Sequence, residues 1–220
     1  MGNTGSMAVH PSSSRQLSRR LSFTSTRKAE DKSILLLGLD SSGKSALAHG
    51  LASIPNAPAT TAHPSSWTPP LPAPTKVACI KTTAIHARMF KLLDMPGHRD
   101  ARHLWYQHMN DVGVVCFCID MSDILRFPLV ANELDRLSAL TASLASSPVV
   151  WLLFTKADCA SPGQRPNAIE TYEAIKKCHV FQTRRSCDWS FILAPAINCL
   201  AETQLSAFKS WVHEHLAMKE

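Results

Sequence analysis

Runs of consecutive apolar residues alternate along this chain with segments whose apolar residues recur at helical spacing. The clearest runs span residues 34–37, 112–119 and 149–154. Such continuous runs predict strands that are buried on both faces of a parallel sheet. Helix-like segments occupy residues 46–52, 101–110, 128–145, 168–178 and 202–218. Strands that alternate with helices predict an α/β fold, with ligand-binding loops at the carboxyl ends of the strands.

Weaker signals complete this pattern. Residues 77–82 and 87–93 predict two strands joined by a tight turn, and residues 191–193 predict a short last strand. Five leucines of the segment 128–145 recur at helical spacing and predict a stripe that faces the core. They are Leu129, Leu134, Leu137, Leu140 and Leu144.

The loop between the first strand and the first helix carries the candidate chemistry. Its sequence, GLDSSGKS at residues 38–45, fits the pattern G-x-x-x-x-G-K-[ST]. Gly38 and Gly43 let the backbone bend so that successive N–H groups point at phosphate oxygens. Lys44 supplies a positive charge for the β- and γ-phosphates, and Ser45 places a hydroxyl where it can ligate Mg²⁺. These residues predict a P-loop.

A second phosphate-site motif follows the strand predicted at residues 87–93. Asp94 and Gly97, in DMPG, have the D-x-x-G spacing in which the acid holds Mg²⁺ and the glycine N–H meets the γ-phosphate. The motif alone is a weak signal. It gains value from its position, one predicted hairpin after the P-loop.

Positive charge is concentrated near the amino terminus. Residues 1–32 carry a net charge of +4, out of +6 for the whole chain of 220 residues. The chain begins MGNTGS, which fits the N-myristoylation pattern with Gly2 as the acceptor. One acyl chain gives marginal membrane affinity, so the basic residues would supply a second attachment signal. We predict a disordered basic tail over residues 1–31 and one domain over residues 32–220; a tail that is only solvated is the alternative.

Cysteine usage and hydropathy limit the class of protein further. The seven cysteines form no C-x-x-C pair, and Cys116 and Cys118 alternate within an apolar run, which predicts core positions. This usage indicates a reduced, cytoplasmic environment. No apolar run reaches the roughly 18 residues that a membrane-spanning helix needs.

Residues 53–74 differ in composition from both of their neighbours. They contain seven prolines and no Asp, Glu, Lys or Arg. Proline at this density excludes a helix or a central strand. The segment is therefore predicted to be an extended, mobile insertion that ends just before Thr75.

Taken in order, GLDSSGKS, Pro74-Thr75, DMPGH, Leu104-Trp105 and TKAD resemble the motifs of Ras-like GTPases. They resemble most the ADP-ribosylation-factor and Arf-like branch, and the nineteen-residue spacing from Thr75 to Asp94 agrees with that branch. The resemblance extends from the first predicted strand to the last predicted helix. It implies a P-loop G domain with a mostly parallel six-stranded sheet and helices on both faces.

The resemblance also implies roles for individual residues. Lys156 would pack along the guanine, and the N–H of Ala196 would contact the guanine oxygen. Asp158 would accept hydrogen bonds from the guanine N1–H and amino group, two donors that adenine lacks. The implied nucleotide-binding residues are Gly38, Leu39, Asp40, Ser41, Ser42, Gly43, Lys44, Ser45, Ala46, Thr75, Gly97, Thr155, Lys156, Asp158 and Ala196, and the implied Mg²⁺ ligands are Ser45, Thr75 and Asp94.

Departures from the family pattern alter these expectations. His98 replaces a water-orienting glutamine; an imidazole can also orient water, so His98 is the candidate catalytic residue, and a solvent-facing, inactive His98 is the alternative. Thr155 replaces the Asn of NKxD, which predicts loss of an amide that braces the P-loop. The segment after Thr75 lacks the family's usual glycine. The connection that leads to Thr75 is longer than the family's by roughly a dozen residues. Arg99 and Arg102 are predicted to form a solvated helix face. The alternative is that they support an active switch, as residues at similar positions do in Gα-like proteins.

These observations predict an Arf-like guanine-nucleotide switch that binds GTP, GDP and Mg²⁺, hydrolyses GTP slowly, and regulates membrane traffic or membrane-associated signalling. The expected partners are effectors of the GTP state, an exchange factor, a GTPase-activating protein and a membrane surface, but no nucleic acid. The expected location is cytoplasmic and peripheral on an endomembrane such as the Golgi. Two alternatives are a GTP-binding docking module without turnover and an ATP-specific P-loop enzyme.

Overall fold

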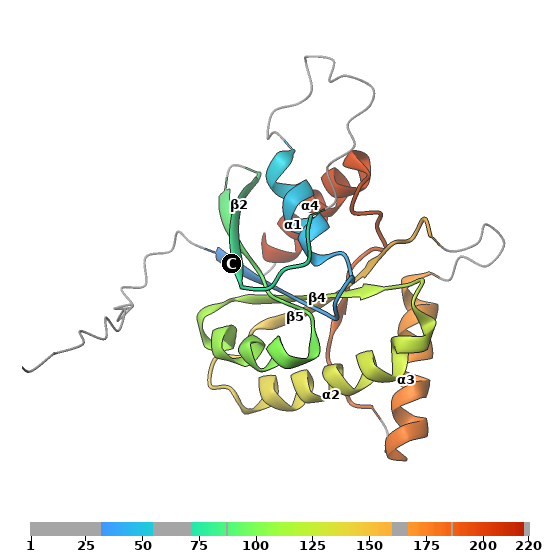
Figure 1. Cartoon of the computed structure of the whole chain (residues 1–220). Helices are drawn as coiled ribbons and strands as arrows, with labels where there is room; N and C mark the ends of the chain where they lie inside the picture. Colours follow the sequence, from blue (N-terminus) through green and yellow to red (C-terminus); the bar gives the residue numbers. More distant parts are fainter. Residues whose placement is uncertain (1–31, 55–71, 87, 160–166, 186, 218–220) are drawn as a thin grey trace, which may run out of the picture.

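The computed structural model describes residues 32–54, 72–86, 88–159, 167–185 and 187–217. One six-stranded sheet runs through this part of the chain, with helices on both of its faces (Figure 1). The predicted tail with Gly2, and residues 55–71 of the proline-rich segment, lie outside the described residues.

The sheet has the spatial order β2-β3-β1-β4-β5-β6. All neighbouring strands are parallel except β2 and β3, which form the predicted antiparallel hairpin. The strands are β1 (Lys32–Leu37), β2 (Cys79–Ile85), β3 (Arg88–Asp94), β4 (Val114–Asp120), β5 (Val149–Thr155) and β6 (Ile192–Leu193). The predicted α/β fold with a mostly parallel six-stranded sheet is confirmed.

Two pairs of helices cover the sheet. Helices α1 (Lys44–Ser53) and α4 (Glu202–Ala217) lie over one face, and α2 (Phe127–Ser143) and α3 (Ala168–Thr183) lie over the other (Figure 1). Two 3₁₀ helices, η1 (Arg99–Asp111) and η2 (Ile124–Arg126), flank β4 in the sequence. No helix in the described part of the chain combines the length and the apolar character needed to cross a bilayer.

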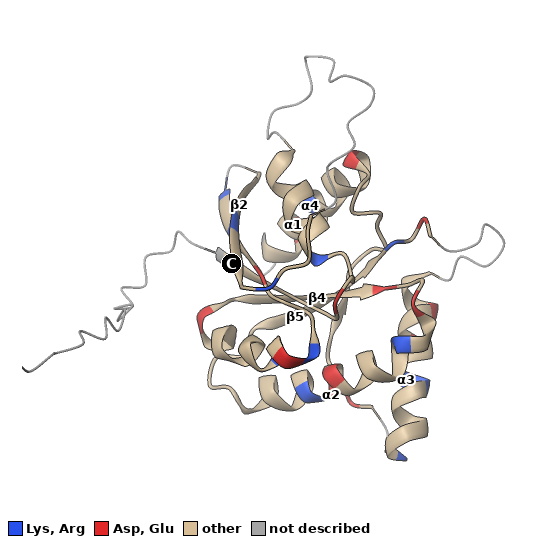
Figure 2. Cartoon of the chain, viewed as in Figure 1, with Lys and Arg blue, Asp and Glu red and all other residues tan. Residues whose placement is uncertain are grey.

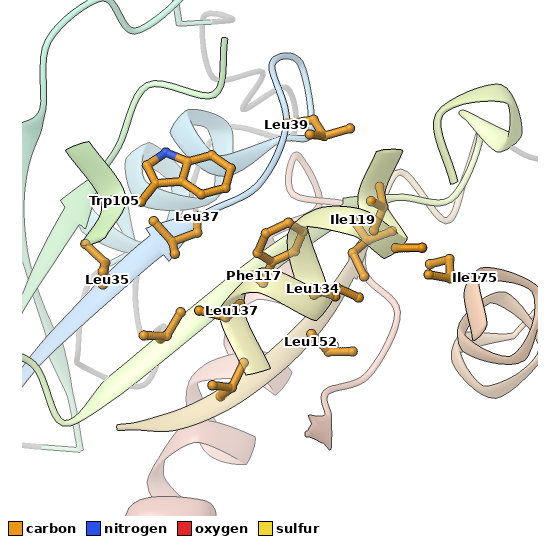
Figure 3. Packing of buried hydrophobic residues seen from close by; sticks show 14 of the residues in the cluster. Leu35, Leu37, Leu39, Trp105, Phe117, Ile119, Leu134, Leu137, Leu152 and Ile175 are labelled. Atoms are coloured by element: carbon orange, nitrogen blue, oxygen red, sulfur yellow. The ribbon is translucent and has the colours of Figure 1, made fainter. Parts of the chain in front are cut away.

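Burial on both faces of the sheet explains the continuous apolar runs. In β1, Leu35 and Leu37 point into the core beneath α2 and η1, whereas Ile34 and Leu36 point into the core beneath α1 and α4. Side chains of successive strand residues alternate between the two faces, so both sets of positions must be apolar. Figure 3 shows Leu35 and Leu37 with Trp105 of η1 in the first of these cores.

The helix predicted at residues 101–110 is present as the 3₁₀ helix η1, and one prediction about α2 is corrected. Trp105 ties η1 to the preceding loop, because its Nε1 donates to the Pro96 carbonyl at 2.8 Å. In the predicted leucine stripe of α2, Leu134 and Leu137 are buried, but Leu129 is 36% exposed, because it lies off the buried face to which Phe127 and Val130 belong.

Candidate nucleotide-binding site

The P-loop turns tightly between β1 and α1. Gly38 has a φ of 137° and Gly43 a φ of 83°, both in the region that favours glycine. A Cβ on Gly38 would lie 2.3 Å from the Cys118 carbonyl oxygen, so a larger residue does not fit there. The loop closes around Lys44, whose Nζ donates to the Leu39 carbonyl at 2.6 Å. Burial lowers the pKa of Lys44, so its ammonium is costly to bury and would gain from an anionic ligand.

The side-chain oxygens of the three predicted Mg²⁺ ligands meet beside the start of α1. Ser45 Oγ and Thr75 Oγ1 are 2.7 Å apart, and Thr75 Oγ1 donates to Asp94 Oδ2 at 3.1 Å. Asp94 is 2% exposed, and its Oδ1 has no hydrogen-bond partner among the described residues. A buried carboxylate oxygen without a donor needs a cation or a bound water to offset its desolvation. These residues therefore fit Mg²⁺, which prefers oxygen ligands.

The loop after β3 packs directly on the P-loop at Gly97. A Cβ on Gly97 would lie 2.5 Å from the Asp40 nitrogen and 2.6 Å from the Leu39 carbonyl oxygen. Both of these atoms belong to the P-loop backbone, so only glycine permits this approach. The structure thus places Gly97 against the loop that would hold the phosphates, as its predicted role requires.

The predicted guanine contacts lie together at the carboxyl ends of β5 and β6. Lys156 Nζ is 2.6 Å from Asp120 Oδ2, at the end of β4, and this ion pair holds the lysine side chain across the site. Asp158 is exposed, so its carboxylate is open to a ligand. The last residue of β5 pairs with Ile197 in an isolated parallel bridge, which places Ala196 beside the same loop.

Thr155 corrects one expectation from the sequence. Its Oγ1 lies 2.9 Å from the Ser42 carbonyl oxygen of the P-loop and 3.0 Å from the Ile119 carbonyl oxygen. Thr155 is fully buried, with an exposed fraction of 0%. The prediction that loss of the asparagine removes the brace on the P-loop is therefore wrong, because the threonine hydroxyl makes a brace of its own.

The change Thr155→Val is expected to weaken binding of GDP about tenfold. It keeps the side-chain shape but removes a buried hydrogen bond worth about 1–1.5 kcal/mol and leaves the Ser42 carbonyl without this donor. Isothermal titration calorimetry measures the affinity. Thr141→Val is the matched control, because it removes a buried hydroxyl that bonds to the Leu137 carbonyl within α2. Equal GDP affinities for Thr155→Val and the wild type would contradict the assignment.

His98 is open to solvent in this structure. Its side chain is 57% exposed, and Nδ1 lies 3.9 Å from Asp100 Oδ2. The imidazole is therefore in the solvent-facing position that the sequence left as an alternative. A catalytic role requires it to turn toward the nucleotide.

Arg102 is the residue whose place the sequence analysis predicted wrongly. It is 8% exposed, and its Nε donates to the Gly97 carbonyl at 2.9 Å. Its Nη1 is 3.1 Å from Glu133 Oε1 in α2, and its Nη2 is 3.8 Å from Asp40 Oδ1. One guanidinium therefore links the Gly97 loop, the P-loop and α2. The signal for its burial was its spacing of three residues from the buried Trp105 on the same helix.

A second arginine reaches the same P-loop carboxylate. Arg126, at the end of η2, pairs with Asp123, and its Nη1 lies 3.2 Å from Asp40 Oδ2. Asp40 thus lies between two guanidinium groups, whereas Arg99 is exposed as predicted. Figure 2 shows that acidic and basic positions occur on both η1 and α2. The network links η1 and η2 to the P-loop through Asp40, and links η1 to α2 through Glu133.

The fold and these loops define a P-loop G domain of the small-GTPase class. A sequence profile of the ADP-ribosylation factor family matches residues 18–198, and the chain belongs to that family of guanine-nucleotide switches.

Individual relatives agree with this assignment. The chain is 28% identical over 152 residues to the small COPII coat GTPase SAR1 of Giardia intestinalis, covering 69% of this chain and 71% of that protein. It is 32% identical over 110 residues to ADP-ribosylation factor-like protein 10 of Mus musculus, covering 49% of this chain and only 40% of that protein.

Solved structures share the fold. The Arl6 BBS3 small GTPase of Trypanosoma brucei, solved with the nucleotide analogue GppNp, aligns with a TM-score of 0.63 and 22% identity over 86% of this chain and 99% of that one. The mammalian SRP receptor aligns with a TM-score of 0.63 and 15% identity over 83% of this chain. At these identities the likeness concerns the fold alone.

Proposed function

We propose that this chain binds GTP and GDP together with Mg²⁺ and that the bound γ-phosphate orders two loops that effectors read. The observation that carries the proposal is the chain of contacts from Ser45 to Thr75 to Asp94 Oδ2, together with the other oxygen of that buried carboxylate, Oδ1, which has no hydrogen-bond partner among the described residues. Thr75 precedes β2 and Asp94 ends β3, so a ligand held by both orders segments from two parts of the chain. Switching by ordering such loops is the physical principle of nucleotide-controlled proteins.

Each residue of the site would have a separate task in hydrolysis. Lys44 would bind phosphate oxygens, and Ser45, Thr75 and Asp94 would hold Mg²⁺, which supplies positive charge against the phosphates when it is bound. His98 would turn from solvent and orient the attacking water. Because His98 is exposed in this structure, hydrolysis is expected to be slow in the free protein.

A membrane role belongs to the same proposal. Gly2 and the basic residues before β1 would attach the protein to an endomembrane surface, with an exchange factor and a GTPase-activating protein controlling its nucleotide state. Its relative in Giardia intestinalis is named as a coat GTPase, which supports a task in vesicle transport.

Competition between GTP, GDP and ATP tests the ligand assignment. Guanine nucleotides are expected to bind with Mg²⁺, and Asp158→Ala is expected to reduce their preference over ATP at least about 100-fold, because it removes the acceptor for two guanine donors. Asp188→Ala changes another exposed aspartate, before β6, and serves as the control. Equal binding of ATP by the wild type would overturn the proposed ligand.

Single-turnover hydrolysis tests the role of His98. His98→Ala is expected to slow hydrolysis about 100-fold, the usual contribution of a positioned general base or acid. His103→Ala removes another exposed histidine of η1 and should leave the rate unchanged. If the protein binds GTP without hydrolysing it, and His98→Ala changes nothing, the result would favour a docking module instead.

A further inference from the structure

A thiol, an imidazole and a carboxylate come together outside the nucleotide site. Cys187 precedes β6, His179 lies in α3, and Asp135 lies in α2, which runs beside α3 (Figure 1). Cys187 Sγ is 2.9 Å from His179 Nδ1, and His179 Nε2 is 3.1 Å from Asp135 Oδ1. The two ring nitrogens thus face a possible proton donor on one side and a negative charge on the other. This is the order of groups found in enzymes with an activated nucleophile.

The contacts around the imidazole leave Nδ1 facing the thiol. Thr183 Oγ1 lies 3.5 Å from His179 Nδ1, but its proton is directed at the His179 carbonyl, at 2.9 Å. Nδ1 is the nearer of two acceptors for the Cys187 thiol, at 2.9 Å against 3.9 Å for the Lys176 carbonyl oxygen, and in the tautomer that accepts this bond Nε2–H faces Asp135. His179 is 3% exposed, and among the described residues Nε2 makes no aligned hydrogen bond, so its contact with Asp135 is electrostatic.

The thiol has a route to ionisation other than loss of its proton to water. Burial raises the pKa of Cys187; Lys176 lowers it, and the carboxylates of Asp135 and Asp188 raise it again. Release of the proton to solvent is therefore unfavourable. Transfer to His179 keeps the proton beside the sulfur and forms an imidazolium whose positive charge faces Asp135.

We propose that Cys187 is a modification site, a nucleophilic thiol that captures small, soft carbon electrophiles with His179 as its base. The Sγ proton moves to Nδ1, and the sulfur electron pair forms the new carbon–sulfur bond while the leaving group departs with the bonding pair. With iodoacetamide the leaving group is iodide, and His179 afterwards returns its proton to solvent. Asp135 acts as a positioning residue that stabilises the imidazolium. Within the described residues no cluster of three or more His, Cys, Asp or Glu fits a metal ion, so this group is not offered as a metal site.

Competitive alkylation of the full chain tests the proposal with an internal standard. The chain is treated with limiting iodoacetamide at pH 6.5, and the labelling rate of each cysteine is read by peptide mass spectrometry. Cys187, although half-buried, is expected to react about tenfold faster than Cys79, which is exposed on β2. His179→Gln should remove this advantage. A Cys187 rate equal to or below that of Cys79 in the wild type would overturn the proposal.

Asp135→Asn separates an activated thiol from a structural one, even where His179→Gln does not fold. If Cys187 ionised alone, loss of the neighbouring negative charge would favour the thiolate and speed alkylation. If the proton passes to His179, loss of the charge that stabilises the imidazolium slows alkylation, and we expect a fall of about fivefold. Asp188→Asn removes a neighbouring charge that does not contact His179 Nε2 and should not slow the reaction. Faster labelling of Cys187 in Asp135→Asn would contradict the proposal.

Discussion

Replacing Arg102 with methionine is expected to lower the free energy of unfolding by about 3–5 kcal/mol. The guanidinium is paired at 3.1 Å with Glu133, whose exposed fraction is 4%, so the change leaves a buried carboxylate without this partner. Arg136 also approaches Glu133 Oε1, at 3.5 Å, but it is largely exposed and cannot offset the loss. Urea denaturation of the wild type and the variant measures the difference. Arg99→Met, at an exposed position of the same helix, is the control and should change stability by less than about 0.5 kcal/mol.

A double variant separates the stability effect from the effect on the switch. In Arg102→Met/Glu133→Leu both members of the buried pair are apolar, so most of the lost stability should return. The hydrogen bond from Arg102 Nε to the Gly97 carbonyl, at 2.9 Å, is still absent. We therefore expect the ratio of GTP to GDP affinity to stay about fivefold below that of the wild type, from the loss of one hydrogen bond near 1 kcal/mol. A wild-type ratio in the double variant would show that Arg102 acts on stability alone.

Replacing Lys44 with methionine is expected to reduce the affinity for both GTP and GDP more than about 100-fold. The reason is the loss of charge-assisted hydrogen bonds to phosphate, each worth about 1.5–3 kcal/mol. The stability of the chain without nucleotide should change far less. Burial lowers the pKa of Lys44, so removing this cation removes a desolvation cost. The same change also removes the hydrogen bond to the Leu39 carbonyl, so the two effects oppose each other. We expect the free energy of unfolding to change by less than about 1 kcal/mol.

Two measurements on the same sample check this expectation. Nucleotide affinity comes from titration calorimetry, and stability comes from urea denaturation without nucleotide. Lys177→Met makes the same chemical change at an exposed position of α3 and should alter neither quantity. A large loss of stability in Lys44→Met without nucleotide would mean that the main role of the lysine is to stabilise the loop rather than to bind phosphate.

Local patterns made the sheet and the P-loop predictable from the sequence. In β1 and β4 every apolar position is buried because helices cover both faces, and burial of both faces produces the continuous runs that the sequence displays. The glycines of the P-loop are likewise local requirements, since Gly38 and Gly43 adopt positive φ. Such features depend on near neighbours in the chain and can be recognised without the fold.

Partners far apart in the sequence could not be predicted in this way. Arg102 finds Glu133 31 residues away, and Thr155 finds the Ser42 carbonyl 113 residues away. The first contact buries Arg102, which was predicted to lie on the surface. The second contact supplies a brace on the P-loop that was predicted to be absent because Thr155 replaces an asparagine.

The contact between Ser45 and Thr75 closes a connection of 30 residues. The entropy lost when a flexible connection is closed grows only with the logarithm of its length. The helix α1 takes up the first part of this connection, so the relation applies to the stretch from the end of α1 to Thr75. Relative to a stretch shorter by roughly a dozen residues, closure is less favourable by about 0.7 kcal/mol, or roughly threefold in the population of the closed form. Chain length before Thr75 is therefore expected to have only a modest effect on nucleotide binding. We therefore expect insertions or deletions before Thr75 to cost little, whereas insertions or deletions within the thirteen residues of η1 would disturb the contacts of Arg102 with Gly97 and Glu133.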